Sequence, residues 1–441
     1  MTVIIKIIQL LLALSILVII HECGHFLFAR IFKTRVEKFY LFFDWPFALF
    51  KRKWGETEYG VGVIPLGGYV KISGMIDESM DREQMKQPPQ PYEFRSKPAW
   101  QRLLIMLGGV FFNFIFALLI YVAVLNFWGE TYLPAKNVRY GILTDSVGYA
   151  MGLRNGDKIL SVDGVEVDNF YSIIPDIILN NRKMITVERD SQIVNLPVDP
   201  EFIPRLLKNP DVLDARIPFG PFIVSDFSEK SPSRDAGILK GDQIIGLDSI
   251  QFKWYDEFQE YLSSHKGKPL LVSVLRGADK FDFKVQPGEN AILGVVRDVS
   301  NIFEFRTKHY NLIQAIPAGI AKGFKTTGDY LKQFRLIFSK KTKAYESLGG
   351  FITIGSIFPG RWNWPSFWNL TAFLSLILAV MNILPIPALD GGHVMFLVFE
   401  VVTGRKPSDK FLEYAQIVGM VILFALLIFA NGNDILRLIR K

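Results

Sequence analysis

The 441-residue sequence contains a single cysteine, Cys23, so no disulfide bond can form within the chain. Charged residues, at 21%, are too many for a chain that lies wholly in lipid, and hydrophobic residues, at 50%, are too many for an ordinary soluble enzyme. A membrane protein with a sizeable soluble insert fits both values. The net charge of +7 does not indicate a nucleic-acid partner, because the basic residues cluster beside apolar segments, as in cytoplasmic loops of membrane proteins. We therefore expect membrane lipid, and no nucleic acid, among its partners.

Four apolar runs are long enough to cross a membrane: residues 3–29, 103–127, 366–386 and 413–430. The first run resembles a signal peptide, but it lacks an Ala-x-Ala-like cleavage site, so we expect it to be retained. Lysine and arginine concentrate in the loop after the first run and in the loop between the last two, which predicts that both loops are cytoplasmic. The N-terminus, residues 129–365 and the C-terminus then lie on the opposite side.

The segment on that opposite side contains an internal repeat. AMGLRNGDKILSVDG (150–164) and DAGILKGDQIIGLDS (235–249) align with a constant offset of 85 residues, the size of one small β-rich domain. Each copy places a Gly-Asp turn before a strand-like stretch. The pattern resembles a PDZ domain, a module that binds extended peptides by adding a strand to a sheet edge. Whether the two copies bind peptides, or only space or gate the membrane part, is left open.

The loop after the first apolar run contains four short stretches rich in aromatic and β-branched residues: VEKFYLFF, FALFKRKW, TEYGVGVI and GYVKISGM. Proline, glycine and aspartate separate them, which predicts a small sheet at the membrane or dipping into it. Such a sheet is tolerated there only where protein or a water-filled cavity satisfies its backbone.

The motif HECGH lies inside the first apolar run. On a helix its spacing places His21 and His25 on one face, which suits a Zn²⁺ ion with two nitrogen ligands, and Glu22 is then placed to accept a proton from water. The alternative, a buried histidine pair beside a solvated glutamate, is disfavoured because no aqueous face is available within an apolar span. Cys23 lies on the other side of the helix and is a poor candidate ligand.

A catalytic zinc needs a third protein ligand. The extended motif of soluble metzincins is missing, because Phe28 and Ile31 stand where it requires glycine and histidine, and Glu37 lies in the basic, strand-like segment. The better candidate is Asp390, in MNILPIPALDGGHVMF at the end of the third run. Alone it would be read as a turn residue, but it supplies the carboxylate that the HECGH site lacks. His393 is interpreted as an outer-shell residue or an alternative ligand.

HECGH, PLGGYVKISGM (65–75) and NILPIPALDGG (382–392), with a PDZ-like tandem between the second and third runs, resemble the site-2 protease family of intramembrane zinc metalloproteases, RseP type. The resemblance covers essentially the whole chain. It implies Zn²⁺ ligands at His21, His25 and Asp390, a catalytic Glu22, and substrate-binding roles for Asn382, Pro385, Gly67 and Gly68. It also implies that the glycine- and asparagine-containing stretch LGGVFFNF (107–114) packs close to the site.

The predicted fold class is a multi-span α-helical membrane protein with four transmembrane helices, a membrane-associated β-sheet and two inserted β-rich PDZ domains. The predicted domains are 1–127 with the first two transmembrane helices, HECGH and the β loop; 128–215 and 216–305, the PDZ domains; 306–365, an amphipathic linker; and 366–441, the last two transmembrane helices. Within the linker, residues 316–338 are amphipathic and either lie on the outer membrane face or brace the PDZ pair.

The resemblance implies a protease of the bacterial inner membrane that cuts transmembrane segments of single-span proteins. Its implied substrates are an anti-sigma factor whose periplasmic part has been shortened and leftover signal peptides, with the PDZ pair as a size filter. The residues alone reach only a membrane-embedded zinc hydrolase with outward peptide-binding modules. Two other classes stay open: a metal transporter, which can also place His, Glu and Asp in lipid, and a non-catalytic PDZ scaffold that retains a structural metal.

Overall fold

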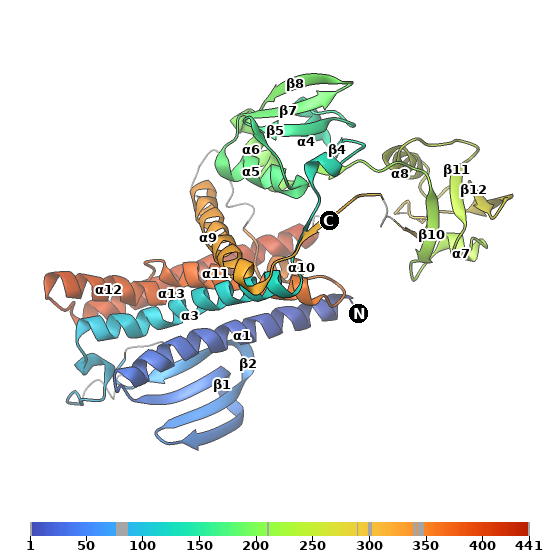
Figure 1. Cartoon of the computed structure of the whole chain (residues 1–441). Coiled ribbons are helices and arrows are strands. Elements are labelled where there is room, and N and C mark those ends of the chain that lie inside the picture. Colours follow the sequence, from blue (N-terminus) through green and yellow to red (C-terminus); the bar gives the residue numbers. More distant parts are fainter. Residues whose placement is uncertain are drawn as a thin grey trace. The chain divides into compact units, whose positions relative to one another are not determined.

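A computed structural model describes residues 2–75, 87–209, 211–288, 290–298, 302–337, 342 and 348–439. The chain divides into two compact units (Figure 1). Unit 1 combines Met1–Gly129 with His309–Lys441, and unit 2 is Glu130–Lys308. The two chain ends, and the last residue of the predicted 316–338 segment, lie outside the described residues.

Unit 1 is mainly helical. Its helices are α1 (Thr2–Ile31), α3 (Ala99–Phe127), α9 (Leu312–Ile337), α10 (Phe351–Ser356), α11 (Trp364–Ile383), α12 (Asp390–Thr403) and α13 (Asp409–Ile439), with a 3₁₀ turn at Phe94–Ser96. Its strands are β1 (Val36–Trp54) and β2 (Thr57–Ile72), which pair with each other.

Helices α1, α3, α11 and α13 are, among the described residues, the four that are long and apolar enough to cross a membrane. They correspond to the four predicted runs. The third run was predicted to extend to residue 386, but α11 ends at Ile383. The cause is local: Leu384 is extended because it precedes Pro385, and a residue before proline is pushed out of the helical region.

Helices α1 and α3 cross at glycines. A Cβ atom at Gly24 would collide with the backbone of Gly108, and one at Gly109 would collide with the rings of His21 and His25. Small residues permit this close approach of two helices in an apolar surrounding. The crossing therefore brings α3 directly against the face of α1 that carries the two histidines.

The β1–β2 sheet lies beside α1 (Figure 1). The pairing register between β1 and β2 is irregular, and Leu41 pairs with both Gly68 and Val61. The two long strands therefore bend back, so that the sheet contains more than two paired segments side by side, which we call rows. Residues 68–72 form an outer row, which pairs on one side only within the described part of the chain. A Cβ atom at Gly68 would meet the side chain of Val18 in α1 and the carbonyl oxygen of Tyr40, so glycine allows the row to lie against α1.

The predicted amphipathic segment is helix α9, and its described contacts are with α3 and α11. Gly319 and Gly323 mark the contact with α3, because a Cβ atom at these positions would meet Val122 and Leu118. The helix thus packs along unit 1.

Unit 2 is rich in β-structure. Its strands are β3 (Glu130–Tyr132), β4 (Ile142–Thr144), β5 (Lys158–Val162), β6 (Val165–Glu166), β7 (Met184–Arg189), β8 (Gln192–Pro197), β9 (Leu213–Ala215), β10 (Phe222–Phe227), β11 (Gln243–Leu247), β12 (Leu270–Arg276), β13 (Asp279–Val285), β14 (Val295–Arg297) and β15 (Arg306–Lys308). Its helices are α4 (Ser146–Ala150), α5 (Ile173–Asn180), α6 (Ile203–Lys208), α7 (Pro232–Asp235) and α8 (Tyr255–Ser264).

The sequence repeat reappears as repeated contacts in two sheets, one ordered β6-β5-β7-β8 and the other β13-β12-β11-β10-β14. In the first, Asp157 is buried and pairs with Arg189 at 2.7 Å. In the second, Asp242 is buried and pairs with Arg276 at 2.8 Å. Each arginine also donates a hydrogen bond to the carbonyl of the glycine that opens the turn. The two copies therefore use the same ion pair to fix the same turn.

Strand β3, where the chain enters unit 2, pairs antiparallel with β15, where it leaves. Glu130 is opposite Lys308 in this register. Unit 2 thus begins and ends at neighbouring points.

Candidate metal centre and active site

The two histidines of HECGH lie on one face of α1, as their spacing predicted. His21 is 8% exposed and His25 is 7% exposed. Their Nε2 atoms face each other at 3.1 Å. The helix thus presents two imidazole nitrogens to one point inside unit 1.

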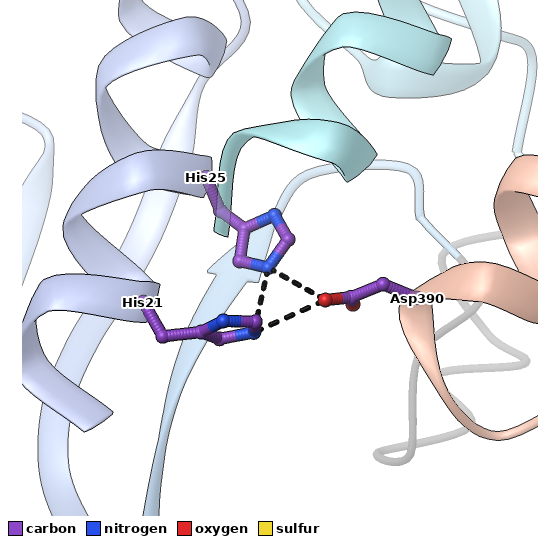
Figure 2. Close-up of side chains that lie close together, drawn as sticks. All are labelled: His21, His25 and Asp390. Carbon is purple, nitrogen blue, oxygen red and sulfur yellow. Dashed lines mark hydrogen bonds and ion pairs between the residues drawn. The ribbon is translucent and has the colours of Figure 1, made fainter. Parts of the chain in front are cut away.

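Asp390, the first residue of α12, completes this cluster (Figure 2). Its Oδ2 atom lies 3.1 Å from Nε2 of His21 and 3.4 Å from Nε2 of His25. Gly391 and Gly392 hold the start of α12 tightly against the preceding loop, since Cβ atoms there would collide with the backbone of Leu384 and Pro387. The loop between α11 and α12 therefore determines where the carboxylate lies.

The cluster fits a zinc ion. In a tetrahedral site with Zn–N and Zn–O bonds of about 2.0–2.1 Å, the ligand atoms are separated by about 3.3 Å. The three separations here are 3.1, 3.1 and 3.4 Å. Two imidazole nitrogens and a carboxylate oxygen that each offer a lone pair also repel one another unless a cation lies between them. A fourth, open position is what distinguishes catalytic from structural zinc sites.

Helix α3 contacts the far side of both imidazoles. Nδ1 of His25 lies 2.9 Å from the carbonyl oxygen of Ile105, and Nδ1 of His21 lies 3.3 Å from Nδ2 of Asn113. Gly109, between these residues on the same face, leaves room for both rings. Both imidazoles are thus contacted from α3 through their Nδ1 atoms.

Glu22 lines a cavity of about 680 Å³ together with the three clustered residues. The sheet also lines this cavity, through Gly67 and through Gly68 and Val70 of the outer row, and the backbone of Val70 hydrogen-bonds to Glu22. The cavity therefore places a carboxylate, the candidate metal centre and an outer strand within one space.

The sheet also contributes charged groups to this cavity. Asp44 accepts hydrogen bonds from Nζ of Lys38 at 2.9 Å and from the hydroxyl of Tyr69 at 3.0 Å, and all three line the wall. Desolvation, the largest single effect, acts to raise the pKa of Asp44, but the hydrogen bonds from Lys38 and Tyr69 and the charge of Lys38 together leave the pKa below its ordinary value. The wall is thus polar, as a site that admits water requires.

The other predicted residues divide into two groups. Asn382 lines the cavity, with Nδ2 3.4 Å from Nε2 of His21, whereas Pro385 is exposed and is not among the residues that line it. His393 lines a separate cavity of about 60 Å³ that also contains Arg102 and Glu400. The structure therefore brings Asn382 to the cluster but does not bring Pro385 or His393 into its cavity.

The family resemblance predicts that residues 107–114 lie near the site, but it does not indicate which of them contact the histidines. A signal was present, because Ile105, Gly109 and Asn113 recur every four residues and so share one face of the helix. Asn113 is also a buried polar residue inside an apolar span, which marks a functional position by default.

Fold and site together define a metal-dependent hydrolase built on apolar helices, and comparison with known proteins agrees. The model of a family described as Peptidase family M50 matches residues 9–426. The chain therefore belongs to this family, the site-2 proteases, and is a zinc metalloprotease and a membrane protein.

Two curated relatives match over nearly their full length. The regulator of sigma E protease of Haemophilus influenzae is 28% identical over 455 residues, which cover 97% of this chain and 98% of the relative. The protease RseP of Yersinia pestis is 27% identical over 456 residues, with the same coverage of 97% and 98%.

Proposed function

We propose that this protein is an intramembrane endopeptidase in which His21, His25 and Asp390 bind the catalytic zinc and Glu22 is the general base. The observation that carries the proposal is the convergence of two Nε2 atoms and one carboxylate oxygen at 3.1–3.4 Å in the cavity that Glu22 lines. When bound, the zinc supplies Lewis-acid activation of the scissile carbonyl and of a water molecule. Glu22 accepts the proton of the attacking water and passes it to the leaving nitrogen.

The substrate must be unwound before it is cut. A transmembrane helix satisfies its own backbone hydrogen bonds, so its carbonyl groups are not available for attack until the helix opens locally. The outer row of the sheet supports a mechanism for this step, because among the described residues it pairs with a neighbouring strand on one side only and it lines the cavity of Glu22, where an extended substrate can add as a further strand. Gly67 and Gly68 keep this edge accessible, and the amide of Asn382 holds the substrate backbone across the cavity. Pro385 acts indirectly, by ending α11 and shaping the loop that carries Asp390.

The cut is proposed to lie near the cytoplasmic face of the bacterial inner membrane. His21 and His25 are roughly 9–15 Å from the end of α1 at Ile31, at 1.5 Å per residue, and basic residues follow that end directly. From the same charge bias we propose that both chain ends and unit 2 lie in the periplasm.

The β1–β2 sheet is proposed to contact the membrane. Trp45 and Trp54 are 75% and 80% exposed, and Phe47 and Phe50 beside them are also exposed. Lysines and an arginine at 51–53 adjoin these aromatic side chains. Exposed tryptophans next to basic residues are typical of the lipid headgroup region.

Unit 2 is proposed to consist of two PDZ domains, at 128–215 and 216–305, joined to unit 1 through the 306–365 linker. The repeated ion pairs of Asp157 and Asp242 support the pairing of the two copies. We propose that they exclude substrates with large periplasmic parts, so that the protease acts on single-span proteins already shortened there. One relative is named for the regulation of sigma E, which supports a truncated anti-sigma factor as substrate. Signal-peptide remnants are proposed as a second class of substrate.

A metal transporter or a non-catalytic scaffold would also use the histidines and the aspartate, but neither needs a carboxylate at Glu22. The discriminating experiment is co-expression of a truncated single-span substrate with the wild type and with Glu22→Gln, which keeps all three proposed ligands. The wild type should cut the substrate, and the variant should lose activity by about 10²–10⁴-fold. Equal cutting by both, or no cutting by the wild type, would contradict the proposal.

A further inference from the structure

We propose that Asn113 is a positioning residue for His21. Its side-chain oxygen accepts a hydrogen bond from Nδ1–H of His21 and so directs Nε2 of that ring toward the zinc. The inference rests on the proposed function, in which His21 binds zinc through Nε2.

The contact lies entirely within the interior of unit 1. Asn113 is 0% exposed, and its amide faces Nδ1 of His21 at 3.3 Å. Its Oδ1 atom is buried and has no hydrogen-bond partner in the part of the chain that the structure describes. The oxygen is therefore not committed to any other described group.

The tautomer of a zinc-bound imidazole determines which atom of the Asn113 amide, Oδ1 or Nδ2, has to face Nδ1 of His21. An imidazole that offers its Nε2 lone pair to a metal carries its hydrogen on Nδ1, so Nδ1 becomes a donor and needs an acceptor. The group that faces Nδ1 of His21 is the amide of Asn113, whose only acceptor is Oδ1. A half-turn of this amide about the Cβ–Cγ bond exchanges Nδ2 and Oδ1 and supplies that acceptor.

His25 shows the same arrangement with a backbone group. Its Nδ1 atom lies 2.9 Å from the carbonyl oxygen of Ile105. Ile105, Gly109 and Asn113 follow one another at intervals of four residues and so lie on the same face of α3. Helix α3 thus offers one acceptor to each imidazole. The acceptor for His25 is fixed in the backbone, whereas the acceptor for His21 is a side chain that can be replaced.

A purely structural role for Asn113 would not need its side chain. The contact between α3 and α11 at this point is made by the backbone, because Oγ of Ser375 donates to the carbonyl oxygen of Asn113 at 2.7 Å. Ser375→Ala therefore perturbs the same helix contact without touching His21, and it is the matched control.

The experiment measures the zinc affinity of the full-length purified protein by competition with a chelator, separately from cleavage. Asn113→Leu keeps the branched shape but removes the acceptor, and it should weaken zinc binding by about 10–100-fold. Asn113→Asp keeps an acceptor and should stay close to the wild-type affinity, as should Ser375→Ala. If the leucine variant is not recovered in folded form, Asn113→Ala takes its place in the same comparison.

The inference would be overturned if Asn113→Leu bound zinc with the wild-type affinity. It would also be overturned if Asn113→Asp bound zinc as weakly as Asn113→Leu. His21→Ala separates this failure from that of the proposed function. Zinc lost in His21→Ala but kept in Asn113→Leu contradicts only the role of Asn113. Zinc kept in His21→Ala contradicts the proposed ligand set itself.

Discussion

Gly24 of α1 lies so close to Gly108 of α3 that a Cβ atom on either residue would meet the backbone of the other. The contact falls between His21 and His25 on one helix and between Ile105 and Asn113 on the other. Close packing of the two helices and the arrangement of the imidazoles are therefore one structural feature.

Gly24→Ala should accordingly damage stability and zinc binding together. The added methyl group forces α1 and α3 apart, at a cost of about 1–3 kcal/mol, and moves both imidazoles away from their contacts on α3. Thermal unfolding in detergent and zinc content measure the two effects. Gly328→Ala is the control, because a Cβ atom at Gly328, in helix α9, meets nothing within 4 Å. A Gly24→Ala protein that unfolds and binds zinc like this control would show that the close crossing is not required.

Pairing of the substrate with the outer row of the sheet predicts a cross-linking pattern. Cys23→Ala removes the single cysteine, and Tyr69→Cys then places one on the outer row, in an inactive Glu22→Gln background. Cysteines moved along the substrate segment should form disulfides at alternate positions, because side chains of a strand alternate between two faces. Tyr59→Cys, on a row that pairs on both sides, should not cross-link. A period near 3.6 residues instead of 2 would show that the substrate is bound as a helix.

Removal of unit 2 tests its proposed role as a size filter. Because β3 and β15 pair side by side, residues 130–308 can be replaced by a short linker without separating the ends of unit 1. We expect the shortened protein to retain zinc, to cut a truncated substrate and also to cut the intact one. Continued rejection of the intact substrate would place the selectivity in unit 1.

Positions with a periodic pattern or a distinctive chemistry could be predicted from the sequence. The four apolar runs, HECGH and the turn-forming repeat all follow from local patterns, and the corresponding helices, histidine face and repeated ion pairs are present in the structure. Asp390 could be selected because the site lacked a carboxylate, although its distance from His21 could not be derived. That distance depends on the loop after Ile383, whose path no local pattern specifies.

The remaining contacts depend on how helices pack, which one sequence does not encode locally. The carbonyl of Ile105 is a backbone group, so no pattern of side chains in the sequence indicates its contact with His25. His393 follows Asp390 by three residues and was a reasonable neighbour of the site, yet α12 turns it toward the cavity of Arg102 and Glu400. The folding of β1 and β2 into several rows likewise depends on irregular register that alternation alone does not reveal.

The ion pair between Asp242 and Arg276 in unit 2 predicts a pH-dependent stability. Two hydrogen bonds from Arg276, each 2.8 Å, hold the pKa of Asp242 below its ordinary value. A lowered folded-state pKa stabilises the fold above the ordinary carboxyl pKa of about 4, and this contribution is lost as the pH falls toward the folded-state pKa.

Asp242→Asn should therefore be less stable than the wild type near neutral pH, with a difference that shrinks below about pH 4. Hydrogen exchange of peptides from residues 216–298 measures it in the full-length protein. Asp235→Asn is the control, since the Asp235 side chain is 72% exposed. A difference that persists unchanged at low pH would contradict the assignment to this carboxylate.

The central claim is that His21, His25 and Asp390 together hold one catalytic zinc, and zinc content per chain tests it most directly. Wild type, Glu22→Gln and His393→Ala, purified in folded form, should each contain about one zinc per chain, because none of these changes removes a proposed ligand. Asp390→Ala should contain far less and should not cut substrate. A folded Asp390→Ala protein with the zinc content of the wild type would contradict the account.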